Sequence, residues 1–373
     1  MKFTIAVIPG DGIGPEVIEQ AKKALDAVAE TYNHIFLYEE ALMGACAIDE
    51  TGGPLPYETI ETCRKADAIL FGAIGDPKYD NNPTARIRPE QGLLNLRREL
   101  ELFCNIRPTK AYDNLIYNSP LKREVIKGTD IVIYRELTGG IYFGEKKLSE
   151  DEQSAFDACS YTVEEISRVT HMAFKEAQNR KKKVTLVDKA NVLETSRLWR
   201  KTVSEIAKDY KDVKLEFLFI DNAVMQMVLN PKQFDVILTE NLFGDIISDQ
   251  AGAIGGSIGI LASSSIGKDN ALFEPIHGSY PQAKGKDIAN PIASILSAAM
   301  LLDYLGLNEE ADAIERAVEK SLVLGITTKD IKRKSQKSTT TSKVGDFIAD
   351  YITNQDDSNM NFRNIHMGQS TII

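Results

Sequence analysis

Short apolar runs alternate with longer amphipathic stretches along the first hundred residues. The runs are "FTIAVI", "HIFLYEE" and "ADAILFGAIG", and helical periodicity lies between them near residues 15–29 and 56–65. This alternation is typical of a protein that places helices over a mainly parallel sheet. We therefore expect an α/β fold.

A second series of strand-like runs follows and predicts a second lobe. Its runs are "DIVIYREL", "KVTLVDKAN", "KLEFLFIDNAVMQMV" and "FDVILTENLFGDIISD", and helical sequence returns from Pro291 onward. A chain of 373 residues exceeds one ordinary core, so we expect two lobes, with the later helices rejoining the first. The acidic stretch "SEDEQSAFDACS" predicts a protruding loop or hairpin. Residues 354–373 form a polar tail, and both a frayed end and a strand on a neighbouring chain stay open.

Composition narrows the classes of partner. The chain has 44 basic and 54 acidic residues, and a net charge of -10 argues against sequence-independent binding of nucleic acid. The four cysteines lie far apart without a C-x-x-C pair, and the most apolar helical stretch is interrupted by Ser294, Ser297 and Asp303. We expect a cytoplasmic protein with reduced thiols and no membrane partner.

The turn in "IPGDGIGPEV" imitates a dinucleotide-binding loop but departs from it. Its third glycine, Gly14, comes one residue early, and Pro15 removes an N–H that would hold phosphate. Glu39 and Glu40 follow the next strand, about where a ribose-binding acid would stand. The sequence favours a tight turn into a helix with Pro15 at its start over a Rossmann site.

Two aspartates in "NLFGDIISDQA" suggest a cation site. Asp245 and Asp249 share a face if this stretch is helical, and their like charges destabilise each other unless neutralised. Asp221, after another predicted strand, could supply a third carboxylate for Mg²⁺ or Mn²⁺. The alternative is a solvated helix face or a cap.

Basic and proton-transfer groups come from separate elements. Arg97, Arg107 and Arg135 could bind a dicarboxylate through bidentate hydrogen bonds, or they could be scattered surface residues. Lys189 ends the strand "VTLVDKAN", where desolvation would make it a base, and Tyr142 lies in the Gly-rich "TGGIYFG". Taken alone, Lys189 could equally be an ordinary exposed lysine, and Tyr142 an ordinary packed tyrosine.

Six motifs in order resemble the β-decarboxylating dehydrogenases, the isocitrate/isopropylmalate dehydrogenase family. They are "IPGDGIGPEV", "GLLNLRRELELFCNIRP", "RELTGGIYFGE", "DKANVLETSRLWR", "NLFGDIISDQA" and "FEPIHGSYPQAKGKDIANP". The resemblance implies two α/β lobes without a Rossmann fingerprint. The cofactor-binding lobe would be formed by 1–102 with 256–353, and the substrate, metal and dimerisation lobe by 103–255. It also implies a homodimer whose active sites are shared between subunits.

The resemblance assigns roles to the residues above. Arg97, Arg107 and Arg135 would bind the substrate carboxylates, and Asp221, Asp245 and Asp249 would bind Mg²⁺ or Mn²⁺. Lys189 and Asp221 would reach across from the partner subunit. Lys189 would accept the hydroxyl proton, and Tyr142 would protonate the enolate that remains after CO₂ departs.

The same resemblance bears on the substrate. Isocitrate dehydrogenases carry a serine for a third carboxylate where this chain has "EQGLLNLR". Leu93, Leu94 and the partner's Val192 would instead bury an isopropyl group, worth roughly 10- to 200-fold in discrimination. Glu90 would line the same site. We therefore expect oxidative decarboxylation of 3-isopropylmalate in leucine biosynthesis. Alternatives are relatives acting on isocitrate, homoisocitrate or tartrate, or a non-catalytic subunit.

For the cofactor the resemblance implies NAD. The implied contacts come from the opening turn, from "DPKYDNNPTARIRPE" and from "HGSYPQAKGKDIAN": Ile13, Asp76, Glu90, His277, Gly278, Ser279, Gln282, Ala283 and Asn290. NAD-linked relatives usually carry an aspartate where this chain has Gln282. A neutral amide can bind a ribose hydroxyl but does not repel a 2′-phosphate, so discrimination against NADP should be weaker.

Overall fold

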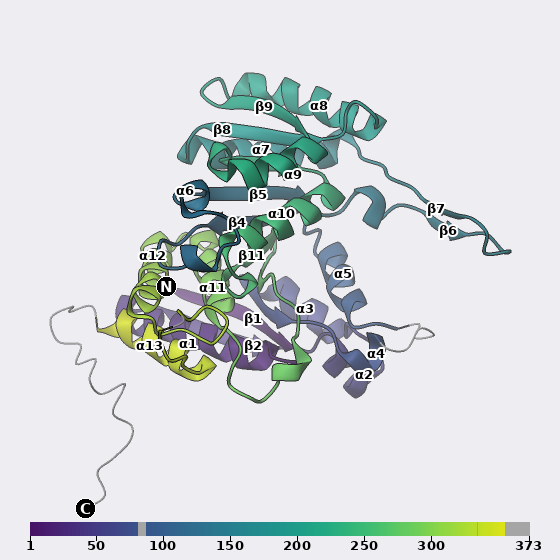
Figure 1. Ribbon diagram of the computed structural model, residues 1–373. Helices are drawn as coiled ribbons and strands as arrows, with labels where there is room; N and C mark the ends of the chain where they lie inside the picture. Colours follow the sequence, from purple (N-terminus) through teal and green to yellow (C-terminus); the bar gives the residue numbers. More distant parts are fainter. Residues whose placement is uncertain (81–86, 334, 355–373) are drawn as a thin grey trace, which may run out of the picture.

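A continuous ten-stranded sheet runs through the centre of the molecule in the computed structural model, which describes residues 1–80, 87–333 and 335–354 (Figure 1). Its strands, in spatial order, are β2 (Ile35–Glu40), β1 (Lys2–Gly10), β3 (Ala68–Ala73), β12 (Ala271–Pro275), β11 (Ala262–Ile266), β4 (Cys104–Lys110), β5 (Asp130–Glu136), β10 (Val236–Thr239), β8 (Lys183–Asp188) and β9 (Lys214–Phe219). Both outer thirds are parallel. The predicted α/β fold with a mainly parallel sheet is confirmed.

The centre of the sheet departs from the parallel pattern. There the three consecutive pairs β12–β11, β11–β4 and β4–β5 are antiparallel. The parallel strands read as continuous apolar runs because helices cover both faces: all six residues of β3 are buried, as are the four residues of β10.

The helices of the described chain gather above and below this sheet. They are α1 (Gly14–Tyr32), α2 (Ala45–Thr51), α3 (Tyr57–Lys65), α4 (Pro77–Asp80), α5 (Glu90–Glu99), α6 (Arg123–Ile126), α7 (Val163–Asn179), α8 (Glu194–Ile206), α9 (Ile220–Leu229), α10 (Asn241–Gly255), α11 (Ile292–Tyr304), α12 (Asn308–Leu324) and α13 (Thr341–Thr353). One hydrophobic cluster joins α1 to α11, α12 and α13, although more than 250 residues of chain separate them. A separate cluster lies beneath α7 and α8. The lobe boundaries given above stay a prediction.

The glycine turn after β1 enters α1 directly. Gly12 has a φ of +59°, and a Cβ there would lie 2.0 Å from the carbonyl oxygen of Ser279. The N–H of Asp11 donates to the carbonyl of Ala73 at 2.8 Å, and that of Ile13 to Ser279 at 2.8 Å. Protein carbonyls thus use these donors, which fits a tight turn rather than a phosphate loop.

The acidic stretch forms a hairpin that projects from the body of the molecule (Figure 1). Its strands are β6 (Lys146–Leu148) and β7 (Ala155–Asp157), and every residue in them is exposed. The predicted protrusion is confirmed. Among the described residues, no helix is long and apolar enough to cross a membrane. Residues 81–86 of the expected cofactor segment, and the tail from 355 to 373, lie outside the described residues.

Candidate active site

Three arginines from separate elements meet at one pocket of about 410 Å³. Arg97 comes from the last turn of α5, Arg107 from β4 and Arg135 from the end of β5, the neighbour of β4 in the sheet. The pocket is lined by Leu94, Arg97, Arg107, Arg135, Leu137, Tyr142, Phe143, Lys146, Asn241 and Asp245. The side chains of Arg97, Arg107 and Arg135 are only 13, 12 and 4 % exposed, which argues against the alternative that they are scattered surface residues.

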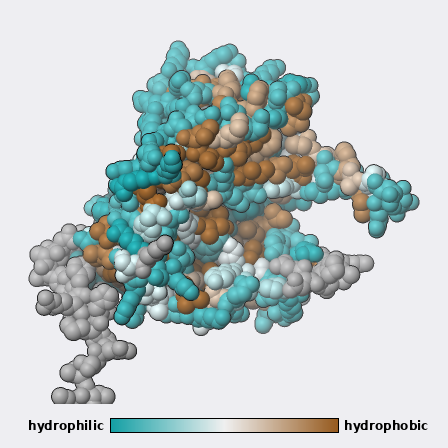
Figure 2. Space-filling model, viewed as in Figure 1, coloured by the Kyte–Doolittle hydropathy of each residue, from teal (hydrophilic) through white to brown (hydrophobic). Residues whose placement is uncertain are grey.

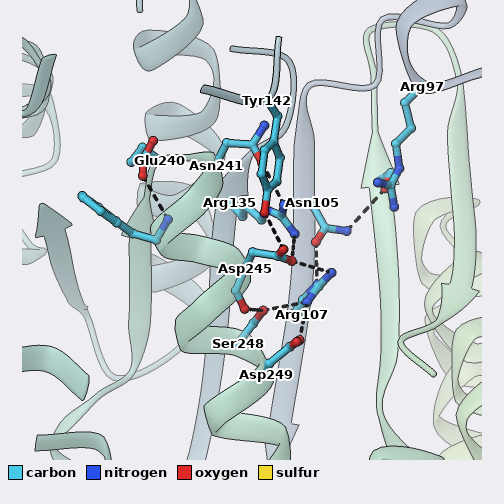
Figure 3. Close-up of polar contacts among 12 residues, drawn as sticks. Arg97, Asn105, Arg107, Arg135, Tyr142, Glu240, Asn241, Asp245, Ser248 and Asp249 are labelled. Atoms are coloured by element: carbon cyan, nitrogen blue, oxygen red, sulfur yellow. Dashed lines mark hydrogen bonds and ion pairs between the residues drawn. The ribbon is translucent and has the colours of Figure 1, made fainter. Parts of the chain in front are cut away.

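Each arginine has an acidic partner, and Figure 3 labels those of Arg107 and Arg135. Nη1 of Arg135 lies 2.5 Å from Oδ1 of Asp245, and Nη2 of Arg97 lies 2.7 Å from Oε1 of Glu274. Nη1 of Arg107 donates to Oδ1 of Asp249 at 3.1 Å. Buried, hydrogen-bonded charges of this kind hold their side chains in fixed orientations.

Burial and charge shift the pKa values of this cluster. Burial, with repulsion from Arg107 next, lowers the pKa of Arg135 to about 10, so the guanidinium remains charged at neutral pH. Burial also lowers the pKa of Arg107. Burial alone would raise the pKa of Asp245, but Arg135 and the hydroxyl of Tyr142 outweigh it, and the net shift is downward. Asp245 is therefore ionised and available as a hard oxygen ligand.

Asp245 and Asp249 project from the same face of α10, as their spacing indicates. The helix begins with Glu240, whose side chain accepts a hydrogen bond from the N–H of Phe243. No group of three His, Cys, Asp or Glu side chains within the described part of the chain is placed to hold a metal ion. A single chain thus assembles two of the three expected carboxylates, whose oxygen chemistry suits Mg²⁺ or Mn²⁺.

The third expected ligand lies elsewhere, together with the expected base. Asp221, in the first turn of α9, accepts from Nζ of Lys189 at 2.6 Å, and this pairing lowers the pKa of Asp221. Val192 follows in the same loop as Lys189 and is 61 % exposed. None of the three lines the arginine pocket of its own chain.

Tyr142 points into the arginine pocket from a short 3₁₀ turn, Gly140–Tyr142 (Figure 3). Its hydroxyl donates to Oδ2 of Asp245 at 2.8 Å. Burial, followed by this carboxylate, raises the pKa of Tyr142 above its ordinary value. The phenol is therefore protonated at neutral pH and able to donate.

The two expected leucines face different surroundings. Leu94 lines the arginine pocket and is 43 % exposed, whereas Leu93 packs against the cluster beneath α5 and lines an adjoining cavity of about 200 Å³. Glu90 begins α5, and its Oε1 would lie 3.1 Å from a Cβ on Gly75, next to Asp76. Both leucines thus line cavities that Arg97 and Arg107 border, and Leu94 is the one in the pocket that also contains Arg135.

A cavity of about 870 Å³ lies between the opening turn and the segment after β12. It is lined by Ile13, Ser257, Ile258, Gly259, His277, Gly278, Tyr280, Ile288, Ala289, Asn290, Lys329 and Asp330. His277 also lines the smaller cavity, together with Arg97 and Arg107, so the two sites adjoin. Nε2 of His277 is buried without a partner among the described residues, and burial lowers the pKa of this ring. A neutral, unpartnered imidazole suits hydrogen bonding to a cofactor.

A comparison with known protein families matches residues 4–348 to the model for isocitrate/isopropylmalate dehydrogenase. The chain belongs to this family. Two similar curated proteins, both named 3-isopropylmalate dehydrogenase, come from Wolinella succinogenes and Bacillus subtilis. The first is 55 % identical, with 94 % of this chain and 98 % of the relative covered; the second is 53 % identical, with 91 % and 94 % covered.

Solved structures of the family share the fold. The isocitrate dehydrogenase of Methylococcus capsulatus matches with a TM-score of 0.84 and 33 % identity, covering 94 % of this chain and 99 % of that one. The β-decarboxylating dehydrogenase of Thermococcus kodakarensis matches with a TM-score of 0.78 and 38 % identity, covering 96 % and 99 %.

The large cavity includes some expected cofactor residues and omits others. Ile13, His277, Gly278 and Asn290 line it. Gln282 and Ala283 do not: Gln282 is exposed, and Ala283 packs against Ile13. The backbone carbonyl of Ser279 instead anchors the opening turn.

Sequence reasoning missed eight of the twelve residues that line this cavity, and two of the eight, Lys329 and Asp330, are charged. Lys329 and Asp330 come from "TTKDIKRKS", a polar stretch without a strand or helix pattern. The carboxylate of Asp330 accepts from Nδ2 of Asn290 at 3.0 Å and from the hydroxyl of Ser257 at 3.1 Å. These contacts depend on long-range packing and leave no mark in the local sequence.

Proposed function

We propose that this protein catalyses the NAD-dependent oxidative decarboxylation of (2R,3S)-3-isopropylmalate to 4-methyl-2-oxopentanoate, a step of leucine biosynthesis. The main observation behind this proposal is the pocket in which three largely buried arginines lie with Leu94 and Tyr142. It adjoins a smaller cavity that Arg97 and Arg107 line together with His277. The names of relatives identical at about half of their positions support the same substrate.

The charges in the pocket support a dianionic substrate accompanied by a cation. The guanidiniums of Arg97, Arg107 and Arg135 pair with three carboxylates, those of Glu274, Asp249 and Asp245. These charges cancel, so two substrate carboxylates would add a net negative charge to a partly buried site. A divalent cation would balance them, which explains why the substrate and the metal would bind together.

Asp245 and Asp249, with Asp221 of the partner subunit, would hold Mg²⁺ or Mn²⁺. When bound, the cation supplies positive charge that stabilises negative charge on the C2 oxygen of the substrate, and NAD supplies the hydride acceptor. Arg97, Arg107 and Arg135 would hold the two carboxylates in place. Leu94, with Val192 of the partner subunit, would cover the isopropyl group and exclude water.

Two residues would move protons. Lys189 of the partner subunit accepts the proton of the C2 hydroxyl as C2 is oxidised. Tyr142 then donates its phenolic proton to C3 after CO₂ has left, and its position in the pocket supports this role.

A homodimer is supported by the surface around α9 and α10. Met225, Leu229 and Ile246 on these helices are 57, 67 and 49 % exposed. Figure 2 shows apolar side chains gathered over the middle of this face, whereas the tip of the hairpin is hydrophilic. Asp221 at the start of α9 and Lys189 in the loop before α8 lie beside this surface. A second copy covering it would bring them towards the other subunit's arginine pocket.

Steady-state assays test this proposal. NADH formation should be fastest with 3-isopropylmalate, NAD and Mg²⁺, and should stop when EDTA removes the cation. Isocitrate, homoisocitrate and tartrate serve as competing substrates, and NADP as the competing cofactor. A purified dimer that forms no NADH from 3-isopropylmalate, or that prefers another of these acids, would contradict the proposal.

A further inference from the structure

Asn241 lines the arginine pocket but is not one of the residues expected to bind the substrate, the cofactor or the cation. Building on the proposed function, we propose that Asn241 is a positioning residue: its carboxamide turns the guanidinium of Arg135 towards a substrate carboxylate without neutralising the arginine's charge. No role for Asn241 follows from the sequence patterns, and its side chain is almost completely buried.

The hydrogen bonds of Asn241 fix the plane of the guanidinium (Figure 3). Oδ1 of Asn241 accepts from Nε of Arg135 at 3.1 Å and from Nη2 at 2.8 Å. These two nitrogens form one edge of the planar fork, so the other edge, which includes Nη1, faces the pocket. Nη1 already donates to a carboxylate there, that of Asp245, at 2.5 Å. This is the edge that a substrate carboxylate would engage.

Asn241 is itself held from two sides. Its Nδ2 donates to the carbonyl of Gly139 at 3.1 Å, and its backbone N–H donates to the hydroxyl of Tyr161 at 3.0 Å. Tyr161 in turn donates to Oε2 of Glu240 at 2.9 Å. With both of its amide groups engaged, the carboxamide cannot flip without losing hydrogen bonds, so the acceptor oxygen is directed at Arg135.

The neutrality of this partner matters for binding an anion. Arg97 is paired with a carboxylate, that of Glu274, which consumes its charge. Arg135 also pairs with a carboxylate, that of Asp245, which the proposed function assigns to the cation. The carboxamide of Asn241 orients Arg135 without adding a second negative charge beside it, so more of the electrostatic attraction for a substrate carboxylate is retained. Arg107 is oriented in the same way, because its Nε donates to Oδ1 of Asn105 at 2.8 Å, while its other edge faces Asp245 and Asp249.

The test is a double-mutant cycle between Asn241 and Arg135, followed by steady-state kinetics. Asn241→Ala should raise the KM for 3-isopropylmalate about 10- to 100-fold and leave the KM for NAD within about twofold, because one charge-assisted contact is misdirected. In an Arg135→Lys background the same substitution should change the KM less than about twofold, since an ammonium has no second edge to orient.

Asn105→Ala provides the matched control. It removes the carboxamide from Arg107 instead, so its effect on the KM for 3-isopropylmalate should persist in the Arg135→Lys background. If Asn241→Ala had the same effect in both backgrounds, or raised both KM values together, the residue would be merely structural and the assignment would be wrong. An unchanged KM for 3-isopropylmalate would overturn it as well.

A second variant covers the case in which the alanine substitution prevents folding. Asn241→Asp keeps the size and the acceptor but neutralises Arg135, so the affinity for the dianion should again fall at least about tenfold. Calorimetric titration with (R)-malate, which has both carboxylates and no isopropyl group, measures this without turnover. Equal malate affinity in wild type and Asn241→Asp would refute the assignment, whereas malate binding without 3-isopropylmalate turnover would contradict only the proposed function.

Discussion

Truncation of Leu94 should reduce the preference for a substrate with an isopropyl group. Leu94 lines the arginine pocket and is 43 % exposed, so a ligand can still cover that part of it. Complete burial of a leucine side chain is worth about 1.5–3 kcal/mol, and covering the remaining 43 % therefore about 0.6–1.3 kcal/mol. Leu94→Ala should accordingly lower kcat/KM for 3-isopropylmalate about three- to tenfold.

The comparison substrate is (R)-malate, which has the same carboxylates and hydroxyl but no alkyl group at C3. Its kcat/KM should change less than about twofold in Leu94→Ala, so the ratio of the two values isolates the apolar contact. Leu93→Ala is the control, because Leu93 sits one residue away and packs against the core. It should lower the melting temperature and leave the substrate ratio unchanged.

A substrate ratio unchanged in Leu94→Ala, or one that falls in Leu93→Ala instead, would refute the assignment of Leu94 to the isopropyl group. Loss of activity towards both substrates by the same factor would also refute it, because it would mean that Leu94 acts through the arginines or the fold.

Three further expectations concern assembly, pH and cation binding. Mixing Lys189→Met with Tyr142→Phe, each inactive alone, should restore about a quarter of wild-type activity after subunit exchange, since half the dimers are hybrids with one intact site; no recovery would exclude shared sites. Partial desolvation, with repulsion from Glu315 and Asp312 next, raises the pKa of Asp303 to about 6. Protonation of this carboxyl therefore stabilises the folded state, and stability should fall as pH rises from about 4 to about 6. Asp303→Asn should thus raise the melting temperature at pH 8 but hardly at pH 4, and equal shifts at both would contradict this. Finally, Mn²⁺ should bind at least about fivefold more tightly when (R)-malate is present. Arg135 is paired with Asp245 in the empty pocket, and a malate carboxylate that takes this arginine would leave Asp245 available to the cation. Calorimetric titrations that agree with and without malate would disprove the coupling.

The alternation of apolar runs and amphipathic stretches was enough to predict the outer parts of the fold. Parallel strands buried on both faces, such as β3, have an unmistakable composition. The antiparallel centre was not predictable in the same way. In the antiparallel pairing of β4 with β5, Cys104 lies opposite Glu136, and neither strand's own sequence shows this direction. The strands β11 and β12 join the sheet from a distant part of the sequence. Local patterns do not encode such pairings.

The candidate site divides along the same line. The spacing of Asp245 and Asp249 placed both on one face of a helix, because that relation is local. Successive helical residues point about 100° apart, so choosing between Leu93 and Leu94 required the position of α5 against the core.

Asn241 presents the harder case, because its importance comes from what it contacts. In the sequence it opens the motif "NLFGDIISDQA", where the two aspartates suggest a function and Asn241 is only the first residue of α10 after the capping Glu240. Its carboxamide acquires a role only when β5 brings Arg135 to the helix start and the turn at Gly139 takes up the other amide group. Residues that bind a ligand leave motifs, since the chemistry demands particular side chains. Residues that orient those side chains are defined by tertiary geometry, and a structure is needed to find them.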